Sequence, residues 1–356
     1  MRSISDTIAR LRPQSITSGA DRLSDLAEPF DNPGALRARA YIPDDLAPGA
    51  PLVVVLHGCT QTAAGYDHGS GWSDVADRHG FALLFPEQTR ANNPNLCFSW
   101  FQDGDTRRGQ GEVASIHAMI GAMSAAHDLD PARVYVTGLS AGGAMTAAML
   151  ATYPEVFAGG AIIAGLPHGV ASGVPQALER MRGQGLPDAR TLARAVRNAS
   201  PHTGPWPRVS VWHGGADATV APPVGEAVVA QWRAVHGLPA TPSEEDVVDG
   251  HAHRMWRDAR GRVAVEAHVI RGMGHGTPLD AEDCGVGGAF MLDVGVSSTL
   301  RIAESWGLTG TAAPRRVRAQ PKVQAQAHAP TPPPRPHAAY AGKVIEDALR
   351  AAGLMH

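Results

Sequence analysis

The sequence predicts an α/β fold with a mostly parallel central sheet and helices on both of its faces. Three observations lead to this prediction. Short runs rich in β-branched residues alternate along the chain with segments of helical spacing. Several of these runs are continuously apolar, which is typical of parallel strands buried on both faces. One run also passes directly into a helix through a serine flanked by glycines.

The strand candidates follow one another from residue 37 to residue 270. Residues 37–43 alternate between polar and apolar as an edge strand does, whereas 51–58 and 81–86 are continuously apolar. Residues 112–127 have helical spacing, and Glu112 suits the first turn of that helix. The remaining strand candidates are RVYVTG (133–138), GAIIAG (160–165), VSVWHG (209–214) and VAVEAHVI (263–270), the last expected to form a β-hairpin with HRMWRD (253–258).

The domain organisation follows from changes in composition. We predict an N-terminal arm at 1–34, a catalytic α/β domain at 35–310, and a Pro/Ala/Arg-rich linker with a short C-terminal helix at 311–356. We expect a flexible tail with a weak helix and no binding partner. The alternative is that the helix docks onto a polymer surface or a partner protein. Residues 166–206 lack a strand pattern and are expected to form helices or a partial lid over the site.

Composition narrows the class of protein. The chain has 356 residues, 44% of them hydrophobic, which is enough for one large domain with tails. A formal net charge of −3 argues against a nucleic-acid-binding protein. No apolar run reaches the length of a membrane span. The odd number of three cysteines argues against a disulfide scaffold but leaves room for one bridge.

Ser140 lies in a G-x-S-x-G pattern between a strand and a helix. Gly138 and Gly142 flank it, an apolar run precedes it, and good helix formers follow it. Such a motif can be an ordinary turn, but this context is typical of the nucleophile elbow of the α/β-hydrolase fold. The sequence therefore predicts that Ser140 is a catalytic nucleophile.

A nucleophilic serine needs a base, and the base needs an orienting acid, in the chain order Ser, Asp or Glu, His. Asp217 follows the apolar run VSVWHG and a Gly-Gly turn, although an aspartate there can also serve only as a turn residue. His275 lies between two glycines after VAVEAHVI. We therefore predict Ser140, Asp217 and His275 as the triad. Three other histidines lack this context: His213, His251 and His253.

The loop that follows residues 51–58 is the candidate oxyanion loop. Gly58 permits a sharp bend, and the backbone N–H groups of Cys59 and Ala141 are expected to bind the oxyanion. We expect His57 to shape this loop by hydrogen bonding and the Cys59 side chain to be structural. The resulting chemistry is acyl transfer from an ester to water through an acyl-enzyme. It needs no metal or organic cofactor, and the histidines show no H-E-x-x-H spacing.

Six blocks of sequence resemble the poly(3-hydroxybutyrate) depolymerase family of esterases, α/β-hydrolases related to feruloyl and acetylxylan esterases. The blocks are HGCTQTAAGYDHGSGWSDVADRHGFALLFPEQ, NNPNLCFSWF, RRGQGEVASI, VTGLSAGGAMT, WHGGAD and GMGHGTP. The resemblance covers residues 35–308. It implies Ser140 as nucleophile, His275 as base and Asp217 as acid. It also implies the N–H groups of Cys59 and Ala141 as oxyanion donors, so the assignment is the same as the one made from the residues.

The resemblance also suggests further residues of interest. Cys59 and Cys97 should lie near each other, because secreted relatives can bridge the equivalent pair, and whether they are bonded here stays open. Trp100 and His57 are candidates for the substrate pocket, and a place in the core is the alternative for Trp100.

The resemblance leaves the substrate open. Poly(3-hydroxybutyrate) or its oligomers, a feruloyl or acetylxylan ester, and a soluble short-chain ester are all compatible, and a catalytically silent binding protein is the alternative of another class. The N-terminus has no apolar h-region, and no separate binding domain is visible. We therefore predict a cytoplasmic protein, with an extracellular one, as for secreted relatives, as the alternative. The oligomeric state is not predicted.

Overall fold

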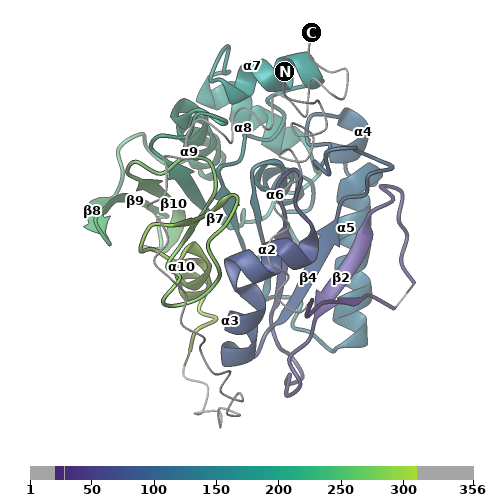
Figure 1. Ribbon diagram of the computed structural model, residues 1–356. Coiled ribbons are helices and arrows are strands. Elements are labelled where there is room, and N and C mark those ends of the chain that lie inside the picture. Colours follow the sequence, from purple (N-terminus) through teal and green to yellow (C-terminus); the bar gives the residue numbers. More distant parts are fainter. Residues whose placement is uncertain (1–20, 28, 311–356) are drawn as a thin grey trace, which may run out of the picture.

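A ten-stranded sheet forms the centre of the molecule (Figure 1). The computed structural model describes residues 21–27 and 29–310. Its six central strands are parallel, and two strands at each end are antiparallel, which confirms the predicted α/β-hydrolase architecture. In spatial order the strands are β1 (Ser24–Asp25), β2 (Arg37–Tyr41), β4 (Ala82–Glu87), β3 (Leu52–Leu56), β5 (Val134–Leu139), β6 (Gly159–Ile163), β7 (Arg208–Gly214), β10 (Val263–Ile270), β9 (His251–Arg257) and β8 (Glu244–Val248).

Helices cover both faces of the sheet, and each face has its own apolar core. The first core lies under α5 (Gly111–Ala126), α6 (Ala141–Thr152), α8 (Ala189–Asn198) and α9 (Pro222–His236). The second core lies under α2 (Ala63–Ser70), α3 (Trp72–His79) and α10 (Ser298–Ser305). The remaining elements are the helices α4 (Asp103–Thr106) and α7 (Val174–Met181) and a small separate sheet of β11 (Thr277–Leu279) and β12 (Met291–Asp293).

The strand candidates from the sequence all become strands, and the 253–258 hairpin forms as the antiparallel pair of β9 and β10. The segment 166–206 contains α7 and α8, and α8 packs beside α9. β2, which the sequence predicted as an edge strand, is the second strand of the sheet, because the two residues of β1 pair with Arg39 and Ala40 on its outer side. Residues 1–20 of the predicted arm and all of 311–356, with the predicted linker and helix, lie outside the described residues.

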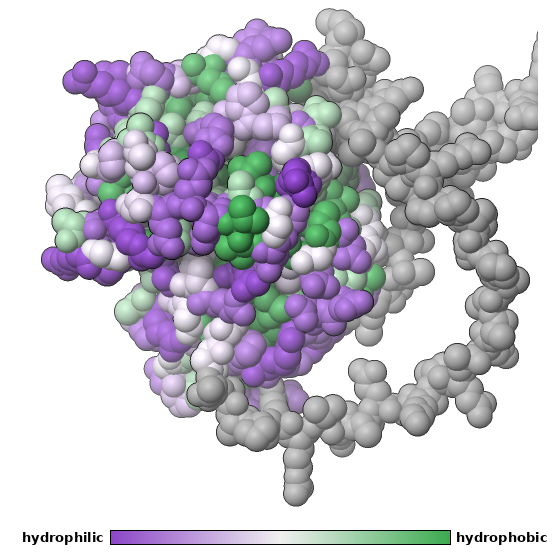
Figure 2. Space-filling view, turned by 90° about the vertical axis from the view of Figure 1, so that its left-hand side faces the viewer, coloured by the Kyte–Doolittle hydropathy of each residue, from purple (hydrophilic) through white to green (hydrophobic). Residues whose placement is uncertain are grey.

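β8 forms the outer edge of the sheet beside β9. Its first three residues, Glu244, Glu245 and Asp246, are all exposed and all acidic. Figure 2 views the molecule from this side and shows a largely hydrophilic surface interrupted by small apolar patches. Charged side chains on an edge strand discourage pairing with another chain. Among the described helices, none has the length and apolar character needed to cross a membrane.

Candidate active site

Ser140 lies at a strained corner between β5 and α6. Its backbone has φ 57° and ψ −116°, a conformation that residues with a side chain rarely adopt. The corner is held in place because the N–H of Ser140 donates to the carbonyl of Ile163 at 2.9 Å. Strain of this kind places the serine side chain at the carboxyl end of the sheet, as in a nucleophile elbow.

Gly142 is needed for the close packing of α6 against β3. A Cβ atom on Gly142 would lie 2.3 Å from the carbonyl oxygen of Leu56 and 2.5 Å from that of His57. A Cβ on Gly138 would lie 2.5 Å from the backbone of Gly142 itself. Real side chains do not tolerate these distances, and backbone atoms cannot rotate away as a side chain can. Both glycines of the motif are therefore required by the turn.

The Asp217 and His275 side chains meet at the same end of the sheet. Nδ1 of His275 lies 2.7 Å from Oδ2 of Asp217, and both side chains are almost completely buried. The two loops that carry them are joined directly, because the N–H of Ala216 donates to the carbonyl of Met273 at 2.9 Å. The structure thus brings together an acid and a histidine that are 58 residues apart in the chain.

The surroundings of Asp217 favour its charged form. Its Oδ1 accepts hydrogen bonds from the N–H groups of Thr219 and Val220, at 2.8 and 2.9 Å. Burial by itself would raise the pKa of Asp217, but the hydrogen bond and charge of His275, with the nearby His213 and the Val220 N–H, bring that pKa below its ordinary value. Asp217 is therefore a carboxylate at neutral pH, able to accept a hydrogen bond from the Nδ1–H of His275.

Ser140 and His275 border the same small pocket. The residues that line it are Gly58, Cys59, Gln61, Leu139, Ser140, His275 and Phe290. Because Nδ1 of His275 faces Asp217, Nε2 is the ring nitrogen left for another group. That Nε2 atom is buried and has no hydrogen-bond partner among the described residues. The serine hydrogen bond of such sites is often formed only when substrate binds.

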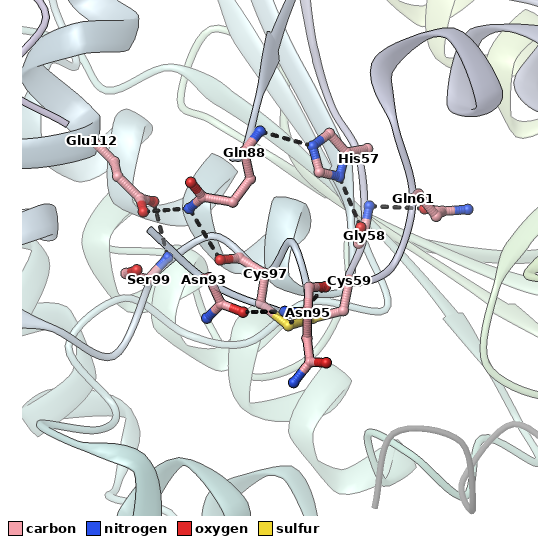
Figure 3. Close-up of a disulfide and its surroundings, with 10 residues drawn as sticks. All are labelled: His57, Gly58, Cys59, Gln61, Gln88, Asn93, Asn95, Cys97, Ser99 and Glu112. Carbon is pink, nitrogen blue, oxygen red and sulfur yellow. Dashed lines mark hydrogen bonds between the residues drawn. A yellow bond between two sulfur atoms is a disulfide. The ribbon is translucent and has the colours of Figure 1, made fainter. Parts of the chain in front are cut away.

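His57 holds the candidate oxyanion loop through hydrogen bonds (Figure 3). The N–H of Gln88 donates to Nε2 of His57 at 3.1 Å, so the ring proton is on Nδ1, which donates to the carbonyl of Gly58 at 2.8 Å. Burial lowers the pKa of His57, which keeps the ring neutral. In a trans peptide the C=O and the next N–H point in opposite directions. Anchoring the Gly58 carbonyl on His57 therefore turns the N–H of Cys59 away from that ring.

A disulfide bond joins Cys59 to Cys97, which resolves the alternative that the sequence left open. Figure 3 shows Gln88 beside Cys97. The Nε2 group of Gln88 donates to the Cys97 carbonyl at 3.1 Å. The same Nε2 donates to Glu112 at 2.6 Å, and the N–H of Ser99 donates to the other Glu112 oxygen at 2.9 Å. Burial raises the pKa of Glu112 to about 7.

Sequence reasoning assigned no supporting role at the site to four polar residues: Gln61 and Gln88, which it did not name, Glu112, which it named only as a helix-start residue, and His213, which it considered only as a base. Gln61 lines the pocket and accepts from the N–H of Gly58 at 2.8 Å. His213 contacts the Val220 carbonyl through Nε2 at 2.8 Å, and the same Nε2 is 3.6 Å from Asp217. Gln61, Gln88 and His213 lie at or just after the ends of predicted strands, which was the available signal, whereas Glu112 lies at a predicted helix start.

Neither of the two candidates for substrate contact, His57 and Trp100, borders the small pocket. His57 is buried and both of its ring nitrogens are engaged, so it supports the loop from below instead of lining the pocket. Trp100 is half-buried and packs edge-on against Phe101, beside the first core and a smaller apolar cluster that includes Leu166 and Leu192. It is not among the residues that border the small pocket, and its contact with substrate stays a prediction.

The chain is similar to known esterases over most of its length. Residues 38–245 match the family described as esterase PHB depolymerase. The poly(3-hydroxyalkanoate) depolymerase C of Paucimonas lemoignei is 46% identical over 284 residues, covering 78% of this chain and 68% of that protein. The feruloyl esterase B of Talaromyces stipitatus is 33% identical over 263 residues, covering 70% of this chain and 71% of that protein.

A solved structure supports the fold. The acetyl xylan esterase from Aspergillus awamori superposes with a TM-score of 0.70 at 23% identity, covering 82% of this chain and all of that one. The elbow, the pocket and these relatives lead to one conclusion. The chain belongs to the PHB depolymerase family of esterases, and it is a carboxylic ester hydrolase.

Proposed function

We propose that Ser140, His275 and Asp217 form the catalytic triad of this hydrolase. The observation that carries the proposal is the buried 2.7 Å contact between Nδ1 of His275 and Oδ2 of Asp217, beside the pocket that Ser140 borders. The carboxylate holds the imidazole in the tautomer with its proton on Nδ1. Nε2 is then free to act as the base.

In the proposed reaction, Oγ of Ser140 attacks the ester carbonyl carbon while Nε2 of His275 takes the hydroxyl proton. The tetrahedral intermediate collapses when the C–O bond to the alcohol breaks and His275 returns the proton to the leaving oxygen. Water then attacks the acyl-enzyme by the same route and releases the acid and the free serine. Asp217 stabilises the imidazolium in both halves.

We assign the oxyanion to the backbone N–H groups of Cys59 and Ala141. Ala141 is the first residue of α6, so its N–H has no acceptor within the helix. The anchoring of the Gly58 carbonyl on His57 supports the matching orientation of the Cys59 N–H. Each such donor contributes about 3 to 4 kcal/mol to stabilisation of the transition state.

For the substrate we favour esters of short 3-hydroxy acids, as oligomers or polymer. The relative named for poly(3-hydroxyalkanoate) is 46% identical, against 33% for the feruloyl esterase. The feruloyl ester is the second candidate because that relative also spans 70% of the chain. For the location, the Cys59–Cys97 bond favours an oxidising compartment, the second of the two predictions from the sequence.

The test compares three substrates: p-nitrophenyl butyrate, a 3-hydroxybutyrate trimer and methyl ferulate. We expect the first two to be hydrolysed, and Ser140→Ala to abolish this turnover while the melting temperature is retained. Turnover of Ser140→Ala within a few-fold of wild type would overturn the assignment of the nucleophile. A clear preference for methyl ferulate would overturn the substrate class and leave the triad standing.

A further inference from the structure

Three potential metal ligands meet on one face of the sheet at β9 and β10, the strands on the left of Figure 1: His253, Glu266 and His268. Glu266 and His268 are two residues apart in β10 and therefore share a face. His253 in β9 pairs directly with His268 across the ladder. Strand alternation and register thus gather the three side chains, and none of them borders the Ser140 pocket.

The distances within this His–Glu–His cluster suit a shared ion better than hydrogen bonds. Oε2 of Glu266 lies 3.5 Å from Nε2 of His253 and 3.8 Å from Nε2 of His268. Hydrogen bonds between such groups are normally about 2.7 to 3.2 Å long. Two ligands of one tetrahedral zinc ion, each bonded at about 2.0 to 2.1 Å, lie about 3.3 Å apart. All three ligand atoms are within 4.8 Å of one another. The rings of His253 and His268 stack at 4.3 Å with an interplanar angle of 21°, and Trp212 also stacks on His268, so a shared ion requires the two imidazoles to turn out of this stacked arrangement.

His253 has a carboxylate partner at one of its two ring nitrogens. Its Nδ1 lies 2.9 Å from Oδ1 of Asp246 in β8, so Nδ1–H donates to that carboxylate, and in the neutral ring Nε2 carries the lone pair. The side chain is only 9% exposed, and Nε2 is buried with no hydrogen-bond partner among the described residues. Carboxylates that accept the second ring proton are the usual support of metal-bound histidines. The 3.5 Å separation from Oε2 of Glu266 is that of an ion pair with a protonated ring, and a metal ion bound at Nε2 would take the place of that proton.

We propose that His253, His268 and Glu266 bind one divalent transition-metal ion of the Zn²⁺ type, with Asp246 orienting His253. Two imidazoles and one carboxylate are a ligand set of zinc, with water as the fourth ligand. Ca²⁺ and Mg²⁺ prefer sites made of oxygen atoms and fit less well. The proposal does not depend on the proposed catalytic triad.

The ion would stabilise the edge of the sheet at β9 and β10. It would link β9 directly to β10, and β10 leads into the loop that carries His275. The nearby cation Arg301 is paired with Asp249 at 2.7 Å and with Glu304 at 3.2 Å, which reduces its repulsion of a bound metal. We therefore assign the ion a structural role in this part of the fold.

The experiment uses the full chain, dialysed against a chelator and then titrated with Zn²⁺ alone by isothermal titration calorimetry. We expect one tight site per chain and a rise in melting temperature with Zn²⁺. His253→Gln and Glu266→Gln should each abolish the tight site, and Asp246→Asn should weaken it about 10- to 100-fold. His251→Gln is the matched control, because His251 lies two residues away in the same strand, and it should bind Zn²⁺ as wild type does.

Two results would overturn the proposal. One is the absence of a tight site in the wild-type chain. The other is a tight site that survives in both His253→Gln and Glu266→Gln, since the ion would then be bound by other residues among the 16 histidines of the chain. Circular dichroism and p-nitrophenyl butyrate hydrolysis check that each variant is folded. A four-coordinate Co²⁺ absorption spectrum, lost in the same two variants, gives an independent measurement.

Discussion

The N–H of Gln88 donates to Nε2 of His57 at 3.1 Å, and this single bond determines which nitrogen of the ring carries the proton. The Nδ1 proton is thereby committed to the Gly58 carbonyl, at 2.8 Å. The orientation of the Cys59 peptide thus depends on a strand end, β4, that contributes no residue to the pocket. Four predictions test this support of the loop, the proposed acid Asp217, the disulfide bond and the buried Glu112.

His57→Gln should lower kcat by roughly 10²- to 10³-fold, with little change in KM. The variant retains most of the side-chain volume but loses the rigid link between Gln88 and the Gly58 carbonyl, so the Cys59 donor loses its orientation. Steady-state kinetics with p-nitrophenyl butyrate measure both constants. His127→Gln, at the end of α5, is the control. A rise in KM at constant kcat would instead make His57 a substrate contact.

Asp217→Asn should lower kcat by about 10³- to 10⁴-fold, because the amide can stabilise the wrong His275 tautomer. The matched control is Asp258→Asn. Asp258 also accepts backbone N–H groups in a turn, from Arg260 and Arg262, and it precedes the start of β10, whereas His275 follows the end of that strand. If Asp217 were only a turn residue, both variants would lose stability and both would retain kcat. Kinetics and melting curves of the pair separate the two roles.

Cys97→Ser should lower both stability and kcat. The disulfide closes a segment of 38 residues, and loss of a native disulfide costs about 2 to 5 kcal/mol. Since Cys59 also carries the proposed oxyanion donor, a looser loop weakens transition-state binding. Cys284→Ala, which changes the one free cysteine, is the control. Equal kcat values for Cys97→Ser and wild type below their melting temperatures would show that the bond does not support catalysis.

Glu112→Gln should remove part of the pH dependence of stability. Burial raises the pKa of Glu112 from 4.5 to about 7 in the folded protein. Between these values the unfolded chain loses its proton and the folded chain keeps it, so wild-type stability falls as pH rises from about 4.5 to 7. The loss is about 3 kcal/mol, from roughly 1.4 kcal/mol per pH unit. Glutamine mimics the protonated form and lacks this loss.

Urea unfolding of wild type and Glu112→Gln at pH 4.5 and 7.5 checks this prediction. The difference between the two proteins should shift by about 3 kcal/mol in favour of the variant at the higher pH. Asp67, whose pKa burial raises to about 6, contributes equally to both proteins and cancels. Parallel pH profiles would mean that Glu112 is charged in the folded state.

The positions of the three proposed catalytic residues were predictable because each residue follows a strand with a strong apolar pattern. Ser140, Asp217 and His275 come after β5, β7 and β10, and parallel strands end at one edge. The Asp217–His275 contact confirms that the two loops meet, whereas the catalytic roles stay proposals.

The supporting polar groups were not predictable in the same way. Glu112 suits a helix start, and nothing in the local pattern distinguishes an exposed first turn from the buried one that forms beside Gln88. β8 was missed because its EEDVV sequence has no apolar alternation. Its strand geometry comes from pairing with β9, which is a tertiary contact.

The two ends of the sheet also restrict how copies of this chain can assemble. At one end β1 offers only two residues, and at the other β8 presents Glu244, Glu245 and Asp246. Two β8 strands placed side by side would bring six carboxylates together, and like charges across a ladder repel. A continuous sheet formed by pairing β8 with β8 across two subunits is therefore disfavoured.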